Sequence, residues 1–180
     1  MTHEKPSNRR VFAFGLVLVG LVGLLVGLGM FTFTYAKGDA YLSDNPEACV
    51  NCHVMREQFD AWQHSSHKSV AACNDCHLPH DNSLHYFWVK AKHGIVDPTM
   101  ELLKNPHDID WHGIRERREE FVYDSGCLNC HKYLNEATEG NRKAFRAHRR
   151  YFSGETERTC VSCHENVGHN RLGYHLEDLG

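Results

Sequence analysis

The feature that most constrains this chain is a short motif, Cys-x-x-Cys-His, which occurs four times and uses all 8 cysteines. Its copies occupy residues 49–53, 73–77, 127–131 and 160–164. In each copy, two thiols three positions apart can add to the two vinyl groups of one porphyrin while the adjacent imidazole reaches the iron. A disulfide framework or a zinc site would not require a histidine after every second cysteine. The motif therefore predicts four covalently attached c-type haems.

The predicted attachment residues are the two cysteines of each motif. They are Cys49, Cys52, Cys73, Cys76, Cys127, Cys130, Cys160 and Cys163.

The 180 residues divide into an apolar N-terminal part and a polar, histidine-rich remainder. Residues 11–36 contain no charged side chain, and a helix of this length would extend roughly 39 Å, enough to cross a hydrocarbon core of about 30 Å. A cleavable signal peptide has an apolar stretch of only about 7–15 residues, so a retained anchor is expected. The predicted parts are a cytoplasmic N-terminus at 1–10, a transmembrane anchor at 11–36 and a periplasmic tetrahaem domain at 37–180.

The orientation of the anchor follows from Lys5, Arg9 and Arg10, which precede the span closely. The positive-inside rule keeps these residues in the cytoplasm, which sends the rest of the chain outward. Thiols that attach haem are handled on the oxidising, exported side of a bacterial inner membrane. Both features predict a single-pass inner-membrane protein with a periplasmic haem domain.

The predicted fold class is mainly α with much irregular loop, one N-terminal transmembrane helix and a small multihaem cytochrome c domain. Residues 37–180 provide about 36 residues for each haem, too few to enclose each porphyrin in its own apolar pocket. We therefore expect a core that is largely haem, with short helices at the attachment motifs and no stable domain without haem. The net charge of -3 gives no reason to expect nucleic acid as a partner.

Residues 83–96 have the periodicity of an amphipathic helix, which is typical of a membrane interface. Lys90, His93 and Asp97 share a neighbouring face, and Pro98 is expected to end the helix. A quinol site needs such polar groups beside an apolar face, because quinol oxidation releases protons with the electrons. Alternatively, Lys90 snorkels to phosphate and Asp97 bonds locally. The apolar positions are Leu84, Phe87, Trp88, Ala91 and Ile95.

Residues outside the motifs must supply the second ligand of each iron, and eleven histidines exceed that need. Many of them could be exposed helix residues instead. Met55 lies two residues after His53, and a thioether is also an iron ligand, although methionine is a common filler of apolar cores.

The sequence resembles the NapC/NirT family of membrane-anchored multihaem quinol dehydrogenases, and within it the compact four-haem small subunits of cytochrome c nitrite reductases. The resemblance covers nearly the whole chain, including the single anchor. The residues and segments that carry it are Met55, Trp62, Ser66, His67, Pro79, residues 90–97 and His169, together with the motifs themselves.

The resemblance implies a set of axial ligands. Met55 rather than His53 would bind the first haem iron, and the catalytic partner could donate a lysine to the fourth haem opposite His164. His148 and His112 are the substitutes if a distal histidine is assigned wrongly. The implied histidine pairs are His77 with His169 for the second haem and His131 with His67 for the third.

The resemblance also implies a function. The chain would oxidise menaquinol beside the first haem, with Lys90 and Asp97 at the quinol and Asp97 close to the first iron without being a strong ligand. Electrons would pass to a periplasmic multihaem nitrite reductase that makes ammonium, and the chain would not reduce the terminal acceptor alone. The alternatives are delivery to another periplasmic reductase such as nitrate reductase, a haem enzyme that itself reduces nitrite or hydroxylamine, and an anchored electron shuttle without a quinol site.

Overall fold

The structure is a computed structural model, which describes residues 8–105 and 108–169. Those residues form helices and loops, with no strand among them. The chain separates into two compact units, one ending at Ser43 and the other beginning at Asp44. Residues 1–7, most of the predicted cytoplasmic N-terminus, lie outside the described residues. The helical fold class is confirmed.

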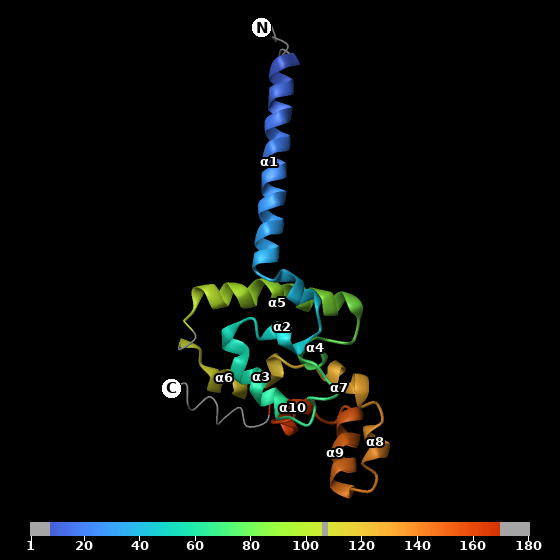
Figure 1. Ribbon diagram of the computed structural model, residues 1–180. Coiled ribbons are helices and arrows are strands. Elements are labelled where there is room, and N and C mark those ends of the chain that lie inside the picture. The colour runs from blue at the N-terminus through green and yellow to red at the C-terminus, as the bar shows by residue number, and fades with distance from the viewer. Residues whose placement is uncertain (1–7, 106–107, 170–180) are drawn as a thin grey trace. The chain divides into compact units, whose positions relative to one another are not determined.

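The first unit consists of α1 (Asn8–Tyr35) and a short 3-10 helix, η1 (Gly38–Leu42). α1 is one uninterrupted helix, long and apolar enough to cross a membrane (Figure 1). It coincides closely with the predicted anchor at 11–36. It stops where Lys37 adopts a left-handed backbone with φ 52°, and a Cβ on Gly38 would overlap the ring of Phe33.

Each attachment motif in the second unit begins or ends a short helix, as expected. Asn45 caps the first of these helices by accepting a hydrogen bond from the Glu47 amide at 3.0 Å. Thr159 caps the last one through the Ser162 amide at 3.3 Å. The four motif helices are α2 (Pro46–Cys49), α4 (Cys73–His77), α7 (Asp124–Cys130) and α10 (Cys160–Cys163).

The other helices of the second unit are also short, except α5. α8 and α9 form a helical hairpin, which Figure 1 shows in orange at one end of this unit. Asn141 caps α9 by accepting hydrogen bonds from two backbone amides. These helices are η2 (His53–Met55), α3 (Arg56–Gln63), α6 (Trp111–Glu116), η4 (Arg118–Glu120), α8 (Leu134–Ala137) and α9 (Arg142–Phe152).

The amphipathic helix at 83–96 is longer than predicted. α5 (Ser83–Leu103) contains Pro98, so the prediction that this proline ends the helix was wrong. Proline removes one helical hydrogen bond, but the hydroxyl of Thr99 donates to the Ile95 carbonyl at 2.6 Å and supports the turn around it. The apolar stripe is solvent-exposed, with Leu84 at 86 % and Trp88 at 72 % exposure.

Very little apolar side chain is buried in the second unit. The buried apolar residues among those described are Ala61, Leu78, Pro79, Val89 and Val161. A side-chain core of this size falls well short of what a domain of this length normally buries. The fold therefore agrees with a domain held together largely by its prosthetic groups.

Candidate haem-binding and electron-transfer site

The four attachment motifs are neighbours in space in the order of the chain. The thiol of Cys73 is within hydrogen-bonding reach of Cys49 and lowers the pKa of Cys49 to about 7. The thiol of Cys160 is likewise within hydrogen-bonding reach of Cys127 and lowers the pKa of Cys127 to about 7. Burial, followed by the charge of Cys127, raises the pKa of Cys76 to about 11. The first cysteine pair therefore adjoins the second, the second adjoins the third, and the third adjoins the fourth.

Backbone packing joins the second motif to the third. The Tyr123 amide donates to the carbonyl of Cys76 at 3.0 Å, just before α7 begins. A Cβ on Gly126 would overlap the carbonyl oxygen of Asp75 in α4, so only glycine allows the two helices to approach this closely. The sequence of the third motif helix thus fixes its spacing from the second.

One carboxylate joins the third motif to the fourth. Asp124, the first residue of α7, accepts a hydrogen bond from the Cys160 amide at 2.9 Å. Its other oxygen accepts from the Tyr151 hydroxyl at 2.7 Å. Burial, together with this hydrogen bond, raises the pKa of Tyr151. Asp124 therefore connects α7, α9 and α10.

Two pairs of histidines face each other across gaps of one size. The ring centres of His77 and His169 are 6.0 Å apart, and those of His67 and His131 are 6.1 Å apart. Two imidazoles that bind one metal place each nitrogen about 2 Å from it, and adding roughly 1 Å from nitrogen to ring centre on each side gives about 6 Å. Both pairs that the resemblance implies therefore fit an iron between them.

In the first of these pairs, the other ring nitrogen of each histidine is already engaged. Nδ1 of His77 lies 2.8 Å from the Phe121 carbonyl, and Nδ1 of His169 lies 2.9 Å from the Gln58 carbonyl. A carbonyl can only accept, so each Nδ1 carries the proton and each Nε2 keeps its lone pair for a metal. Burial lowers the pKa of His77 to about 4 and also lowers that of His169, which keeps both rings neutral.

The first motif lacks such a described histidine pair. Met55 ends η2, and its side chain is 36 % exposed. The side chain of His53 lies outside the described part of the chain. The carboxylate of Asp97 and the ammonium of Lys90 both act on the pKa of the Cys49 thiol, in opposite directions. The two predicted quinol residues therefore lie within electrostatic range of the first motif.

Lys90 belongs to a polar cluster that the sequence did not reveal. Its ammonium forms an ion pair with Asp44 at 2.9 Å and lies 3.4 Å from the Tyr86 hydroxyl. Burial lowers the pKa of Lys90, but the hydrogen bonds to Asp44 and Tyr86 outweigh it, so the net shift is upward. Asn74 also donates to Asp44 at 2.6 Å. Asp44 lies far from α5 in the sequence, and no local pattern signals the contact.

Asp97 pairs with His93, which the sequence left without an assigned role. The Asp97 carboxylate lies 3.1 Å from Nδ1 of His93, and His93 precedes Asp97 by one helical turn. The hydrogen bond with Asp97 raises the pKa of His93, and this effect is larger than the lowering of the pKa by burial. The i, i+4 spacing is the signal that could have identified this pair from the sequence.

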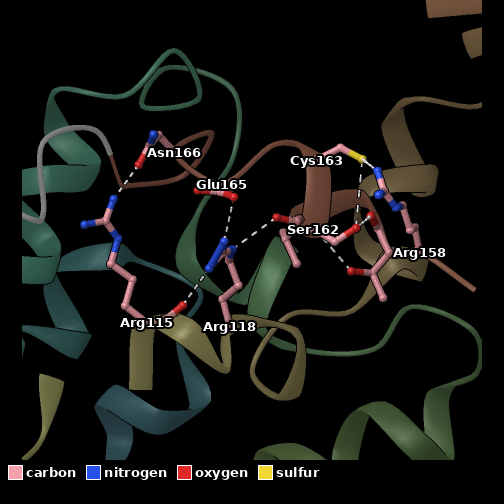
Figure 2. A network of polar contacts seen from close by, with 9 residues as sticks. Arg115, Arg118, Arg158, Ser162, Cys163, Glu165 and Asn166 are labelled. Atoms are coloured by element: carbon pink, nitrogen blue, oxygen red, sulfur yellow. Dashed lines mark hydrogen bonds and ion pairs between the residues drawn. The ribbon is translucent and has the colours of Figure 1, made fainter. Parts of the chain in front are cut away.

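Polar contacts hold the loop that follows the fourth motif (Figure 2). Arg118 forms an ion pair with Glu165 at 2.9 Å and donates to the Val161 carbonyl at 3.3 Å. Arg115 donates to Asn166 at 2.8 Å. These contacts support the chain on both sides of His164, which is itself exposed. Val161, inside the fourth motif, is buried, so these contacts hold the motif helix against the second unit.

Comparison with known proteins agrees with this geometry. Residues 7–174 match the model of the NapC/NirT cytochrome c family, N-terminal region. The cytochrome c-type protein NrfH of Wolinella succinogenes is 36% identical over 87% of this chain and 88% of its own. The cytochrome c nitrite reductase subunit NrfH of Nitratidesulfovibrio vulgaris is 30% identical over 96% and 93%.

A solved structure is similar over the same extent. It is the crystal structure of a cytochrome c nitrite reductase NrfHA complex bound to the HQNO inhibitor, with a TM-score of 0.50 and 30% identity over 87% of this chain and 91% of that chain. The family model spans both the anchor helix and the motif-bearing unit. The chain is therefore a membrane-anchored c-type cytochrome and belongs to the NapC/NirT cytochrome c family.

Proposed function

We propose that this chain is a membrane-anchored tetrahaem quinol dehydrogenase, which oxidises menaquinol at the outer face of the bacterial inner membrane and delivers the electrons to a periplasmic multihaem nitrite reductase. The observation that carries the proposal is the spatial order of the four motifs. Cys49 adjoins Cys73, Cys76 adjoins Cys127, and Cys127 adjoins Cys160. Covalently bound haem c supplies one-electron redox chemistry at each motif.

The quinol end of this path is the polar face of α5. Lys90 and Asp97 both lie within electrostatic range of Cys49, so a ring bound between them would lie beside the first haem. The exposed apolar stripe of α5 suits contact with lipid and with an isoprenoid tail. Interfacial helices with such a stripe lie in the plane of the membrane surface.

The side chains around this site can manage the protons. Oxidation of a quinol releases two protons with two electrons, so hydrogen-bonding groups must orient the hydroxyls and accept the protons. Lys90 stays protonated because Asp44 and Tyr86 raise its pKa, and it can donate to a quinol oxygen. The His93 and Asp97 pair is partly exposed and can accept a proton and release it to water.

The exit end is the fourth motif. It is the last of the four motifs in their spatial order, and α10 lies in contact with α7 of the third motif. A haem bound at the end of this order could pass its electron to a second protein that docks there. One relative is named as a subunit of cytochrome c nitrite reductase, and the similar solved structure is a cytochrome c nitrite reductase NrfHA complex. We therefore assign a nitrite reductase catalytic subunit as the recipient, which forms ammonium from nitrite.

Reduction of the holoprotein in liposomes tests the quinol site. Menaquinol is added and haem reduction is followed by absorbance for wild type, Lys90→Leu and Asp97→Asn. Lys92→Leu is the matched control, because Lys92 is an exposed lysine two residues along the same helix. Fast reduction should be lost in both site variants and kept in the control, with the haem content unchanged.

Equal rates of haem reduction in all four proteins would contradict the proposal that Lys90 and Asp97 form the quinol site. HQNO, which the related complex binds, provides a second readout: it should slow the menaquinol reaction of the wild type. Reduction by dithionite should be the same in every variant, which separates loss of the quinol site from loss of haem.

A further inference from the structure

We propose that the fourth haem is bound by two histidines of this chain, His164 of the motif and His148 of α9. This inference rests on the proposed attachment of a haem at Cys160 and Cys163, and not on the quinol or on the recipient. It replaces the expectation that a partner protein donates a lysine at this position. The iron would then be six-coordinate before any partner binds.

The first argument is the geometry of the two rings. The ring centres of His148 and His164 are 6.4 Å apart, with an interplanar angle of 22°. This separation is close to the 6.0 Å of His77 and His169 and the 6.1 Å of the pair on the third motif. All three pairs thus have the spacing of about 6 Å that two imidazoles on one metal require. One member of every pair is the histidine of a Cys-x-x-Cys-His motif.

The second argument is the tautomer of His148. Its Nδ1 lies 3.4 Å from the hydroxyl oxygen of Thr138, a weak contact. That hydroxyl already donates its proton to the Leu134 carbonyl at 2.6 Å, so its oxygen can only accept from His148. Nδ1 therefore carries the proton, and Nε2 keeps the lone pair that binds iron. His77 and His169 are arranged in the same way, with a carbonyl in place of the hydroxyl.

The third argument is that the carboxylate of Asp124 connects α9 to α10. Tyr151 lies one turn after His148 on α9, and its hydroxyl donates to Asp124 at 2.7 Å. The same carboxylate accepts the amide hydrogen bond of Cys160, the first residue of α10, at 2.9 Å. One side chain therefore fixes the helix that carries His148 against the motif that carries His164. Contacts of this kind orient metal ligands in other proteins.

The inference has a consequence for the partner. If both axial positions are filled within this chain, a recipient protein would receive electrons from the fourth haem without coordinating its iron. The spin state of that iron should then be the same in the isolated chain and in a complex. A ligand supplied by a partner would instead leave an open iron in the isolated chain.

Carbon monoxide titration of the reduced, detergent-solubilised holoprotein tests the ligand directly, because carbon monoxide binds only at an open or weakly held iron position. Haem content is measured first by the pyridine haemochrome method. His148→Gly should bind about one more carbon monoxide per chain than the wild type, and added imidazole should reverse this gain by replacing the lost ring. His112→Ala is the matched control, since His112 is the other substitute ligand that the sequence offered; it should bind as much as the wild type.

Three results of the carbon monoxide titration would overturn the inference: equal binding by wild type and His148→Gly, a gain in His112→Ala, or a fall in wild-type binding when a nitrite reductase catalytic subunit is added. A second variant covers the case in which His148→Gly does not mature. His148→Met should keep a six-coordinate low-spin iron, and one of its electron paramagnetic resonance signals should change from the bis-histidine to the histidine–methionine type; an unchanged spectrum would overturn the inference. A haem count other than four would contradict the proposed function instead.

Discussion

Replacing Gly126 by alanine should loosen the contact between the second and third motifs. The added Cβ would overlap the carbonyl oxygen of Asp75, which is backbone and cannot rotate away. Three hydrogen bonds fix the two segments against each other. They are the bond from the Tyr123 amide to the Cys76 carbonyl at 3.0 Å, that from the His80 amide to the Ser125 hydroxyl at 2.9 Å, and that from His77 to the Phe121 carbonyl at 2.8 Å.

The magnitude follows from these contacts. Adding a methyl group to a tightly packed position costs typically about 1–3 kcal/mol. Relieving the overlap by moving α7 would strain or break at least one of the three hydrogen bonds, each of which contributes about 1 kcal/mol net. We therefore expect Gly126→Ala to lower the free energy of unfolding of the holoprotein by about 2 kcal/mol.

Denaturant unfolding of the holoprotein measures this loss, with the Soret band reporting the loss of axial coordination. Gly140→Ala is the matched control, because a Cβ at Gly140 meets no heavy atom within 4 Å. The control should unfold within about 0.5 kcal/mol of the wild type. Equal stability of Gly126→Ala and Gly140→Ala would refute the argument that this glycine sets the spacing of the two motifs.

Further substitutions test three separate contacts. Asn141→Ala removes the N-cap of α9 and should cost about 1 kcal/mol of stability in the same unfolding experiment; no loss would contradict the capping role. Tyr151→Phe deletes one hydrogen bond to Asp124 and should also cost about 1 kcal/mol of stability. The double variant of Tyr151→Phe with Asp124→Asn should lose less stability than the two single variants lose together, and a double-mutant cycle measures the difference. Asp97→Asn should lower the pKa of His93; since the native pKa of His93 is raised, the stability from this pair is fully present below about pH 6.5 and is lost as the pH rises through the raised value. The thermal midpoints of Asp97→Asn and wild type should therefore differ most on the acidic side and converge as the pH increases, and a gap that widened with pH would contradict the pairing.

The sequence predicted those features that depend on local pattern. The anchor helix and the short helices at the motifs follow from uninterrupted hydrophobicity and from the Cys-x-x-Cys-His spacing, and both are confirmed. The end of α5 was predicted wrongly, because the helix continues through Pro98 with the support of Thr99. The general tendency of proline to end a helix was outweighed here by the hydrogen bond that the neighbouring Thr99 makes.

The histidine pairs came from the resemblance and not from any spacing in the sequence. His77 and His169 are far apart along the chain, and only the fold brings their rings to 6.0 Å. Ligation of iron by these residues stays a prediction, which the ring spacing supports. Asp44 and Asp124 were missed altogether, because each acts on partners that lie tens of residues away. Tertiary contacts of this kind leave no periodic signal in the sequence.

The central claim is that electrons enter beside the first motif and leave at the fourth. Ammonium formation from nitrite tests it most directly, in liposomes that contain the holoprotein and menaquinol, with a nitrite reductase catalytic subunit outside. We expect ammonium only when both proteins are present, at a rate that falls in Lys90→Leu and Asp97→Asn and is unchanged in Lys92→Leu. Ammonium formation by this chain alone, or by the catalytic subunit with menaquinol in its absence, would contradict the account.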